Sequence, residues 1–368
     1  MARIRDLVIV GGGPAGLAVA IAAARRGLDA LVLERATLPA DKACGEGLLP
    51  TGVRAVEALG ARSCLDPAGH MPIRAIRWID GERVAEARLP APGGLAVRRT
   101  ALSAALAATA RAAGAEVRER VAVRAHRRER DEVTVETAEG EERARMLVAA
   151  DGLASAIRRR ESLDGPERPD RRFGMRRHFA VRPWTDAVEV HFADGVEAYV
   201  TPAGPGRVGV AFLCEDGARD GYLRLLARFP RLAARLDGAG FDSVAAGAGP
   251  LARAARRRTL DRLVLVGDAA GYLDAITGEG LSLALAGALD LGSALPDALR
   301  AGASSGSLAA WERRERLRFG RYAAVTRLVL ALARRPALRA RVLDQLGRRP
   351  ALFSRLVAAA VGPTGTAP

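Results

Sequence analysis

Residues 7–24 read LVIVGGGPAGLAVAIAAA, contain no charged side chain, and constrain the fold more than any other part of the chain. Eighteen uncharged residues reach the length of a membrane span, and the basic residues before them could also mark a secretion signal. Three glycines and a proline lie in the middle of this run, however. Each glycine costs a helix about 1 kcal/mol, and the proline costs about 3 kcal/mol. We therefore expect two separate elements here and no continuous helix.

The divided run predicts a strand, a helix and a second strand. Residues 4–10 are β-branched and almost entirely apolar, which is typical of a buried parallel strand. Residues 14–26 are rich in alanine and precede Gly27, a residue type that often ends helices. Residues 29–34 form the next apolar run and end at Glu34. This order predicts a βαβ unit and an α/β fold.

The turn between the first strand and the helix has the spacing Gly-x-Gly-x-x-Gly. Gly11 would allow the tight turn, Gly13 would let the backbone approach a pyrophosphate, and Gly16 would let the helix lie close to the strand. The phosphates would meet free N–H groups at the positive end of the helix. Glu34 would accept hydrogen bonds from ribose hydroxyls. A glycine-rich turn without a ligand is the alternative, but this order of elements predicts dinucleotide binding.

Composition narrows the class of protein. A chain of 368 residues suits one large domain or two interleaved domains, and 49% hydrophobic residues suffice for a core. No other uncharged run approaches spanning length, so we expect a cytoplasmic protein. Cys44, Cys64 and Cys214 show no paired spacing, which predicts neither a disulfide framework nor a zinc site.

The net charge of +15 is unevenly distributed. Residues 300–368 hold 14 arginines against 3 acidic residues, so residues 1–299 carry only +4. The basic segment has no nucleic-acid motif and no stacked aromatic residues, and we predict no nucleic-acid partner. A solvated helix face explains the charge best, and weak peripheral contact with a membrane through the C-terminal helices is the alternative.

The rest of the chain predicts a second, β-rich unit. Residues 73–89 read as a hairpin about Asp80-Gly81, and residues 173–213 alternate as an antiparallel sheet does. From residue 281 onward the pattern is helical. We expect a nucleotide-binding domain formed by 1–72, 95–165 and 255–300, a substrate domain formed by 73–94 and 166–254, and a helical segment over 301–368. A cleft between interleaved domains is the usual place for a ligand.

Two further motifs identify a family resemblance. VAADGLASAIRR carries Asp151 and Gly152, and LVLVGDAAGYLDAITGEGLSLAL carries Gly267-Asp268 and residues 278–280. With the glycine turn, they make the chain resemble the FAD-dependent monooxygenase superfamily, which includes p-hydroxybenzoate-type aromatic hydroxylases and geranylgeranyl reductases. The resemblance spans most of the chain. It implies a Rossmann-like FAD-binding domain, FAD as cofactor, and NADPH or NADH as transient reductant.

The resemblance also implies which residues contact FAD. They are Gly11, Gly13, Pro14, Ala15 and Gly16 at the pyrophosphate, Glu34 and Arg35 at the adenosine ribose, Arg99 at the phosphates or ribityl chain, Asp151 and Gly152, Gly267 and Asp268 at the ribityl chain, and Gly278, Glu279 and Gly280 at the flavin pyrimidine edge. Arg98 is the alternative to Arg99. A helix N-terminus near that edge would stabilise a reduced, anionic flavin by about 0.3–1 kcal/mol. The family carries a proline where this chain has Ala275, which changes the loop beside the flavin.

A fourth motif, DKACGEGLLP, covers residues 41–50. It resembles a segment that approaches the flavin ring in the reductase branch and in some bacterial natural-product hydroxylases. We therefore expect Lys42, Cys44 and Gly45 beside the cofactor, with the glycine allowing close backbone approach. Lys42 is the only lysine in the chain, and a compact ammonium suits a tight site better than a guanidinium. Cys44 would either pack as a small residue or act as a redox or nucleophilic group.

Several functions remain open at this point. DKACGEGL, RRT, FGMRRHFAV and YVTP together resemble bacterial flavoproteins associated with polyketide phenols, including alkylresorcinols. We therefore favour NAD(P)H- and O₂-dependent hydroxylation of a phenolic small molecule, with lipidic phenols among the candidates. The alternatives are saturation of isoprenoid double bonds and a non-catalytic flavin scaffold or redox sensor. A halogenase is disfavoured because the chain has no W-x-W-x-I-P segment.

The catalytic residues are less defined than the cofactor contacts. His178, His191 and Tyr199 lie on the predicted substrate sheet, and a histidine could act as a base. With Cys44, His191 and Tyr199 are the catalytic candidates. Alternation places Val188, Val190 and Phe192 on one face of a strand and His191 on the other, and which face lines the cleft is left open.

Overall fold

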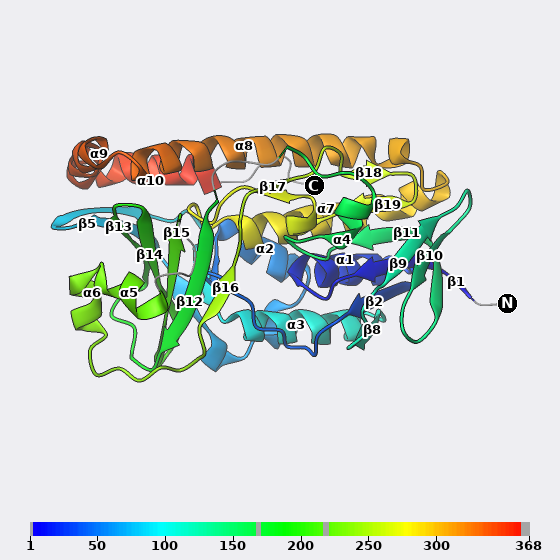
Figure 1. The fold of residues 1–368 in the computed structure, drawn as a ribbon, viewed down its shortest axis with the longest axis horizontal. Helices are drawn as coiled ribbons and strands as arrows, with labels where there is room; N and C mark the ends of the chain where they lie inside the picture. The colour runs from blue at the N-terminus through cyan, green and yellow to red at the C-terminus, as the bar shows by residue number, and fades with distance from the viewer. Residues whose placement is uncertain (1–2, 167–170, 216–220, 362–368) are drawn as a thin grey trace.

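The computed structural model describes residues 3–166, 171–215 and 221–361. Two large sheets lie side by side along the long axis of the molecule, and helices cover them (Figure 1). The predicted α/β fold class is confirmed. The strands of the two sheets come from the two sets of residues that the sequence assigns to separate domains, while the domain boundaries themselves stay a prediction.

The first sheet has eight strands in the order β18-β19-β11-β1-β2-β8, with β10 and β9 continuing from β11. Their bounds are β1 (Ile4–Val10), β2 (Ala30–Glu34), β8 (Glu116–Glu119), β9 (Ala125–Arg128), β10 (Val133–Glu136), β11 (Glu141–Ala149), β18 (Thr259–Leu260) and β19 (Leu263–Leu265). β1 pairs in parallel with β2 and β11, and β11 pairs in parallel with β19. The carboxyl ends of these four strands therefore meet at one edge.

Helices α1 (Pro14–Ala24), α3 (Arg99–Ala112) and α7 (Gly280–Arg300) pack together against one face of this sheet. Leu17 and Ile21 of α1 are fully buried in that cluster, and burying each such side chain stabilises the fold by about 1.5–3 kcal/mol. α1 ends two residues before the predicted end, because the chain turns there and Gly27 adopts a φ of +77°. Small residues let the helices approach: a Cβ built on Gly292 of α7 would lie 2.2 Å from the Cβ of Ala22.

The second sheet has seven strands in the order β16-β12-β15-β14-β13-β5-β6. Their bounds are β5 (Ala75–Asp80), β6 (Arg83–Arg88), β12 (Phe173–Phe179), β13 (Ala187–Ala193), β14 (Val196–Gly204), β15 (Arg207–Cys214) and β16 (Ala246–Ala248). The hairpin β5–β6 closes where predicted, with Gly81 at a φ of +61°. The strands between residues 173 and 213 pair antiparallel, as predicted, and β5 joins their sheet by pairing in parallel with β13. Parallel pairing requires a long connection. The chain between β5 and β13 provides one, because it forms strands of the first sheet before it returns.

Three C-terminal helices complete the fold: α8 (Ala309–Ala333), α9 (Pro336–Arg348) and α10 (Pro350–Val361). α8 extends along the molecule, and α9 and α10 turn back over the seven-stranded sheet, where they pack on β6 (Figure 1). α9 and α10 both begin at a proline, a residue type that suits the first turn of a helix. The remaining elements are α2 (Pro50–Ala58), α4 (Ala156–Arg160), α5 (Gly221–Ala227), α6 (Pro230–Arg235), β3 (Gly47–Leu48), β4 (His70–Ile73), β7 (Gly94–Val97), β17 (Arg253–Ala254) and β20 (Gly271–Tyr272). Within the described ranges, no helix is long and apolar enough to cross a membrane.

The close approach of α1 and α7 yields a stability prediction. Gly292→Leu should lower the free energy of unfolding by about 1–3 kcal/mol, because the new side chain forces the two helices apart. Urea denaturation followed by circular dichroism measures the loss. Gly320→Ala is the matched control: Gly320 is exposed on α8, with open space around a built Cβ, and should gain about 0.5–1 kcal/mol from helix propensity. Equal stability of Gly292→Leu and the wild type would contradict the packing described here.

Candidate active site

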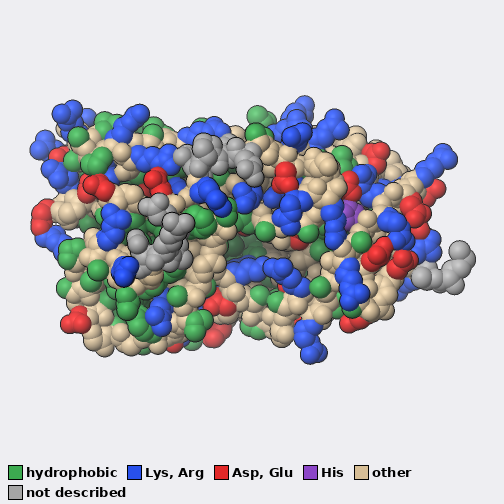
Figure 2. Space-filling model, viewed as in Figure 1, with side chains coloured by type: hydrophobic (Ala, Val, Ile, Leu, Met, Phe, Trp, Pro, Cys, Tyr) green, Lys and Arg blue, Asp and Glu red, His purple; other side chains and the backbone are tan. Residues whose placement is uncertain are grey.

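A cavity of about 610 Å³ is lined by residues from both sheets and from the C-terminal helices. Figure 2 shows a hollow near the middle of one face, with hydrophobic side chains in its depth. The residues that line the cavity include 14 of the predicted cofactor contacts: Gly13, Pro14, Ala15, Arg35, Lys42, Cys44, Gly45, Arg99, Gly152, Gly267, Asp268, Gly278, Glu279 and Gly280. Segments far apart in the chain therefore share one space of the size that ligand sites usually have.

The glycine turn has two glycines facing the protein and one facing the cavity. A Cβ built on Gly11, whose φ is +110°, would lie 2.3 Å from the carbonyl oxygen of Ala150. A Cβ built on Gly16 would lie 2.0 Å from the carbonyl oxygen of Gly11. Around Gly13, by contrast, no described atom beyond its chain neighbours lies within 4 Å of a built Cβ. The N-terminus of α1 is thus open to a ligand at Gly13, where the pattern predicts a pyrophosphate.

Glu34 and Asp151 do not line the cavity. Their carboxylates accept hydrogen bonds from backbone N–H groups of segments beside it. One Glu34 oxygen accepts a hydrogen bond from the Gly12 N–H at 2.6 Å, and the other accepts from the Ala36 N–H at 2.9 Å. Glu34 therefore anchors the glycine turn to the end of β2. The Asp151 Oδ2 accepts from the Ala156 N–H at 2.8 Å and caps the start of α4. Its Oδ1 has no hydrogen-bond partner among the described residues.

Charged groups gather at the cofactor side of the cavity. Burial lowers the pKa of Arg99 and of Lys42, while burial raises the pKa of Asp268, which faces both cations. The Arg99 Nη1 is buried and has no hydrogen-bond partner within the described part of the chain. A buried guanidinium with a free donor suits an anionic oxygen of a phosphate.

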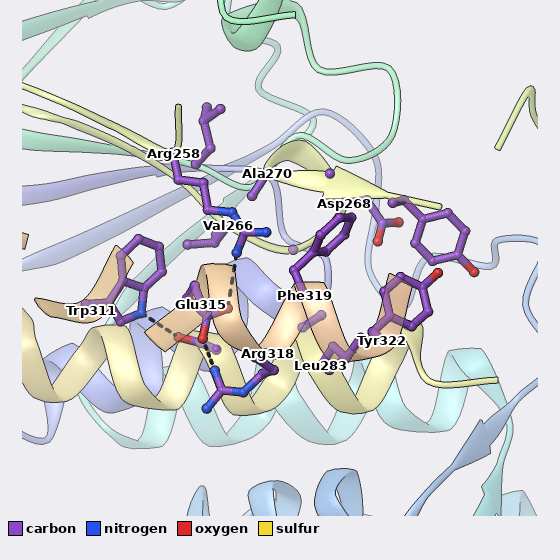
Figure 3. A pocket seen from close by; sticks show the side chains of 17 residues that line it. Arg258, Val266, Asp268, Ala270, Leu283, Trp311, Glu315, Arg318, Phe319 and Tyr322 are labelled. Carbon is purple, nitrogen blue, oxygen red and sulfur yellow. Dashed lines mark hydrogen bonds and ion pairs between the residues drawn. The ribbon is translucent and has the colours of Figure 1, made fainter. Parts of the chain in front are cut away.

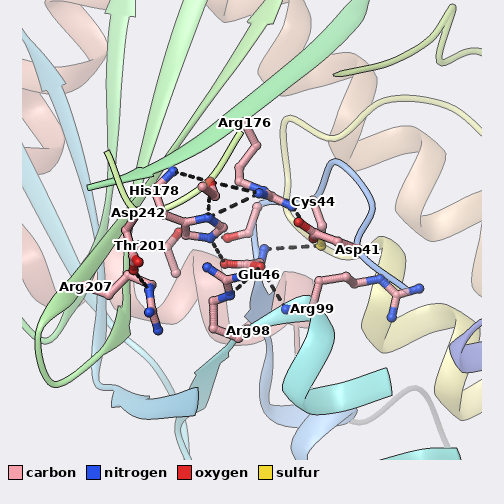
Figure 4. Close-up of polar contacts among 12 residues, drawn as sticks. Asp41, Cys44, Glu46, Arg98, Arg99, Arg176, His178, Thr201, Arg207 and Asp242 are labelled. Atoms are coloured by element: carbon pink, nitrogen blue, oxygen red, sulfur yellow. Dashed lines mark hydrogen bonds and ion pairs between the residues drawn. The ribbon is translucent and has the colours of Figure 1, made fainter. Parts of the chain in front are cut away.

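The loop that carries the fourth motif is held by a buried polar cluster (Figure 4). Glu46 adopts a φ of +60° and is almost fully buried. One of its oxygens accepts from the Arg99 N–H at 2.8 Å, and the other lies 2.6 Å from the His178 Nε2. His178, on β12, thus acts on the loop through Glu46 and does not itself line the cavity.

Arg176 and Thr201 fix the same loop from the seven-stranded sheet. The Arg176 guanidinium donates to the Asp41 carboxylate at 2.5 Å and to the Lys42 carbonyl at 3.0 Å. The Thr201 hydroxyl donates to the Gly45 carbonyl at 2.8 Å. These contacts could not be predicted from the sequence, because no local pattern links residues more than 130 positions apart.

Cys44 lies in the cavity wall beside this cluster. Its Sγ accepts a hydrogen bond from the Glu46 N–H at 3.2 Å. Burial raises the pKa of the Cys44 thiol, so the group stays protonated near neutral pH. A protonated thiol can donate a proton but is a poor nucleophile.

The seven-stranded sheet turns apolar side chains to the cavity. Val188 and Val190 of β13 line it, whereas His191 points to the other face and lies 3.2 Å from a Glu189 oxygen. The expectation that His191 acts in catalysis therefore finds no support in its position, because alternation along the strand turns it away. Tyr199 does line the cavity, but its hydroxyl donates to the Ile276 carbonyl at 2.5 Å. Burial raises the pKa of Tyr199 well above the ordinary value, so the phenol stays neutral and holds the segment that carries Ile276.

The cavity has two chemically different parts. We call residues 41–50, which carry the fourth motif, the Cys44 loop. The polar part of the cavity consists of Asp41 on this loop and of Arg176 and Thr201 beside it. The apolar part is formed by side chains of β5, β13, α8 and α10, namely Ile76, Trp78, Val188, Val190, Val329 and Val357. The apolar part lies under the C-terminal helices, which therefore complete the site.

A second, much smaller space of about 40 Å³ lies against the other side of Asp268 and Gly280 (Figure 3). Glu315 of α8 forms ion pairs there with Arg258 and Arg318. The Trp311 indole N–H donates to the Gly287 carbonyl of α7 at 3.2 Å. This volume holds only one or a few water molecules and is too small for a substrate. The contacts around it therefore hold α8 against α7.

The family follows from comparison with known proteins. The model of the FAD binding domain family matches residues 5–213, which is more than half of the chain. The chain belongs to this family. It is an FAD-dependent oxidoreductase, as the sequence predicts.

Individual relatives of this flavoprotein include both reductases and a monooxygenase. The menaquinone reductase of Mycobacterium tuberculosis is 32% identical over 308 residues, covering 76% of this chain and 74% of the relative. Digeranylgeranylglycerophospholipid reductase 1 of Methanopyrus kandleri is 32% identical over 305 residues, covering 76% and 77%. Rifampicin monooxygenase of Streptomyces venezuelae is 31% identical over 314 residues, covering 78% and 63%. The structure of p-nitrophenol 4-monooxygenase from Pseudomonas putida has a TM-score of 0.83 at 21% identity over all of both chains, a likeness of fold.

The residues of the cavity fit FAD. The open N-terminus of α1 and the unpartnered Arg99 donor suit the diphosphate, and Asp268 is placed to meet a sugar hydroxyl. Residues 278–280 lead into α7, whose N-terminal N–H groups suit the electron-rich edge of the flavin.

Arg99 allows a direct test of this fit. Arg99→Gln should weaken FAD binding by about 10–100-fold, since a hydrogen bond to a charged group contributes about 1.5–3 kcal/mol. Fluorescence titration of the apoprotein with FAD measures the dissociation constant. Arg98→Gln is the control, because Arg98 does not line the cavity and lies 3.8 Å from a Glu46 oxygen instead. A larger effect at Arg98 than at Arg99 would reverse the assignment.

Proposed function

We propose that this flavoprotein hydroxylates a phenolic substrate that carries a long apolar chain, with NAD(P)H and O₂ as co-substrates. Bound FAD would supply the redox chemistry. The observation that supports this proposal most is the division of the cavity into a polar part beside the Cys44 loop and an apolar part under α8 and α10.

The two parts match the two halves of such a substrate. Hydroxyl groups on an aromatic ring need hydrogen-bond partners when they leave water. The Arg176 Nε has no partner among the described residues, and the Thr201 hydroxyl, which donates to the Gly45 carbonyl, can still accept a hydrogen bond. An alkyl chain needs only apolar contact, and each buried methylene contributes about 0.8 kcal/mol. Trp78 and Val357 provide such surface, with the Trp78 ring 4.9 Å from that of Phe353 on α10.

Saturation of isoprenoid double bonds is the second candidate. Two observations favour it: the Cys44 thiol is held protonated in the cavity wall, and two of the relatives carry reductase names. An alkene needs a proton donor and no polar partner for a ring hydroxyl. In this function the Cys44 loop would supply the proton, and O₂ would take no part.

One assay with Cys44→Ser separates the two functions. We expect alkylresorcinols to stimulate NAD(P)H oxidation at least tenfold in air, with a product heavier by one oxygen atom, and Cys44→Ser to retain most of that activity. Geranylgeranyl lipids incubated anaerobically with a flavin reductant are the comparison. Products heavier by two hydrogens, formed without O₂ and lost in Cys44→Ser, would refute hydroxylation in favour of the second candidate.

The apolar part yields a prediction on chain length. Val357→Phe fills space on the cavity side of α10, so the KM for a long-chain phenol should rise about tenfold, as expected for about two displaced methylenes. The KM for a short-chain phenol should change less than twofold. Leu356→Phe is the matched control, because Leu356 is the neighbouring residue and is 53% exposed. Equal effects on both chain lengths would contradict the placement of the tail.

We also propose weak peripheral membrane contact through the C-terminal helices. Leu328, Leu338 and Leu352 are exposed apolar residues on α8, α9 and α10, and basic residues dominate these helices. A lipidic substrate could then enter the apolar part from the bilayer surface.

A further inference from the structure

Glu279 is a buried carboxyl in the wall of the cavity, directly before the first residue of α7. Only 8% of the residue is exposed. The Thr277 hydroxyl hydrogen-bonds the carboxyl, while its Oε2 has no hydrogen-bond partner among the residues that the structure describes. A carboxyl in this condition is poorly stabilised as an anion.

The surroundings of Glu279 are neutral. Tyr322 of α8 lies near enough to feel its charge, and the Tyr272 ring packs on Gly280. Thr326 of α8 lies behind Thr277, with their hydroxyl oxygens 3.4 Å apart. Burial raises the pKa of Glu279 to about 7, and no neighbouring cation is among the causes of that shift. The group can therefore change its charge near neutral pH.

The position of Glu279 matters because the start of α7 is where the reduced, anionic edge of FAD is expected. Two negative charges in a dry site repel each other strongly. The helix N-terminus can stabilise one of them, and no second cation is available from the groups named above.

We propose that Glu279 takes up a proton when the bound FAD is reduced, so that reduction of the cofactor and neutralisation of this carboxylate are coupled. In the balanced step, two electrons and one proton enter the cofactor from NAD(P)H or, in the test, from dithionite and water. A further proton passes from solvent to the Glu279 carboxylate. Glu279 thus acts through charge on the cofactor and needs no contact with substrate.

The sign of the pH dependence follows from this coupling. Well below pH 7 the carboxyl is protonated in both redox states, so its presence has no effect. Above about pH 7 it is ionised when FAD is oxidised and protonated when FAD is reduced. Reduction of the wild type then becomes harder with rising pH by about tenfold per pH unit more than in a variant without the carboxyl. The difference levels off where the carboxyl stays ionised in both states.

The test uses the FAD-loaded protein and no substrate, so it stands apart from the proposed function. Wild type and Glu279→Gln are reduced anaerobically in the presence of a reference redox dye, and the ratio of reduced to oxidised FAD is read from absorbance between pH 5.5 and 9. We expect equal ratios below pH 6 and a ratio at least tenfold higher in Glu279→Gln at pH 9. Glu279→Asp should restore the wild-type pH profile, and Glu57→Gln, which removes an exposed carboxyl on α2, should match the wild type.

Parallel pH profiles of wild type and Glu279→Gln, within twofold at every pH, would overturn the proposal. Glu279→Ala provides a second variant without a carboxyl and must show the same profile as Glu279→Gln. If either variant bound FAD but differed from the wild type by a constant factor at all pH values, the effect would be structural and the proposal would also be wrong. Circular dichroism and FAD titration of each variant report folding and cofactor occupancy independently.

Discussion

The contact between the glycine turn and the residue that follows β11 is the constraint on which the rest of the structure depends. Gly11 and the Ala150 carbonyl approach so closely that a single added carbon would displace the backbone. That approach brings the ends of β1 and β11 together and aims the start of α1 at the cavity. Gly16 then lets α1 lie on its own turn, and Gly292 lets α7 lie on α1. Each helix can take its place only if the preceding contact is formed, because protein interiors are close-packed and leave no room for a shifted helix.

A second constraint connects the two sheets across the cavity. The Cys44 loop emerges from the nucleotide-binding sheet but is held by Arg176, His178 and Thr201 of the other sheet. Burying Glu46 and Arg176 costs desolvation, and their hydrogen bonds compensate that cost only in one arrangement of the loop. The polar cluster therefore specifies the position of Cys44 relative to the cofactor site more than it adds stability.

Two buried carboxyls at the cavity have different roles because their surroundings differ. Glu46 has a hydrogen-bonding partner for each oxygen and holds the loop. One oxygen of Glu279 has no partner among the described residues, and burial raises its pKa to about 7, so its protonation can respond to a nearby charge. The C-terminal helices contribute apolar side chains, since α8 and α10 complete the apolar wall that β5 and β13 begin.

Short-range patterns in the sequence determined the βαβ unit, the glycine turn, the prolines that start α9 and α10, and the α/β class. These features depend on backbone sterics and on side-chain periodicity, which act between near neighbours and can be read from the chain itself. Tertiary structure alone decided the parallel pairing of β13 with β5, the face on which His191 lies, and the contacts among Glu46, Arg176 and His178. Such features depend on which distant segments pack together to bury apolar surface, and a local pattern does not contain that information.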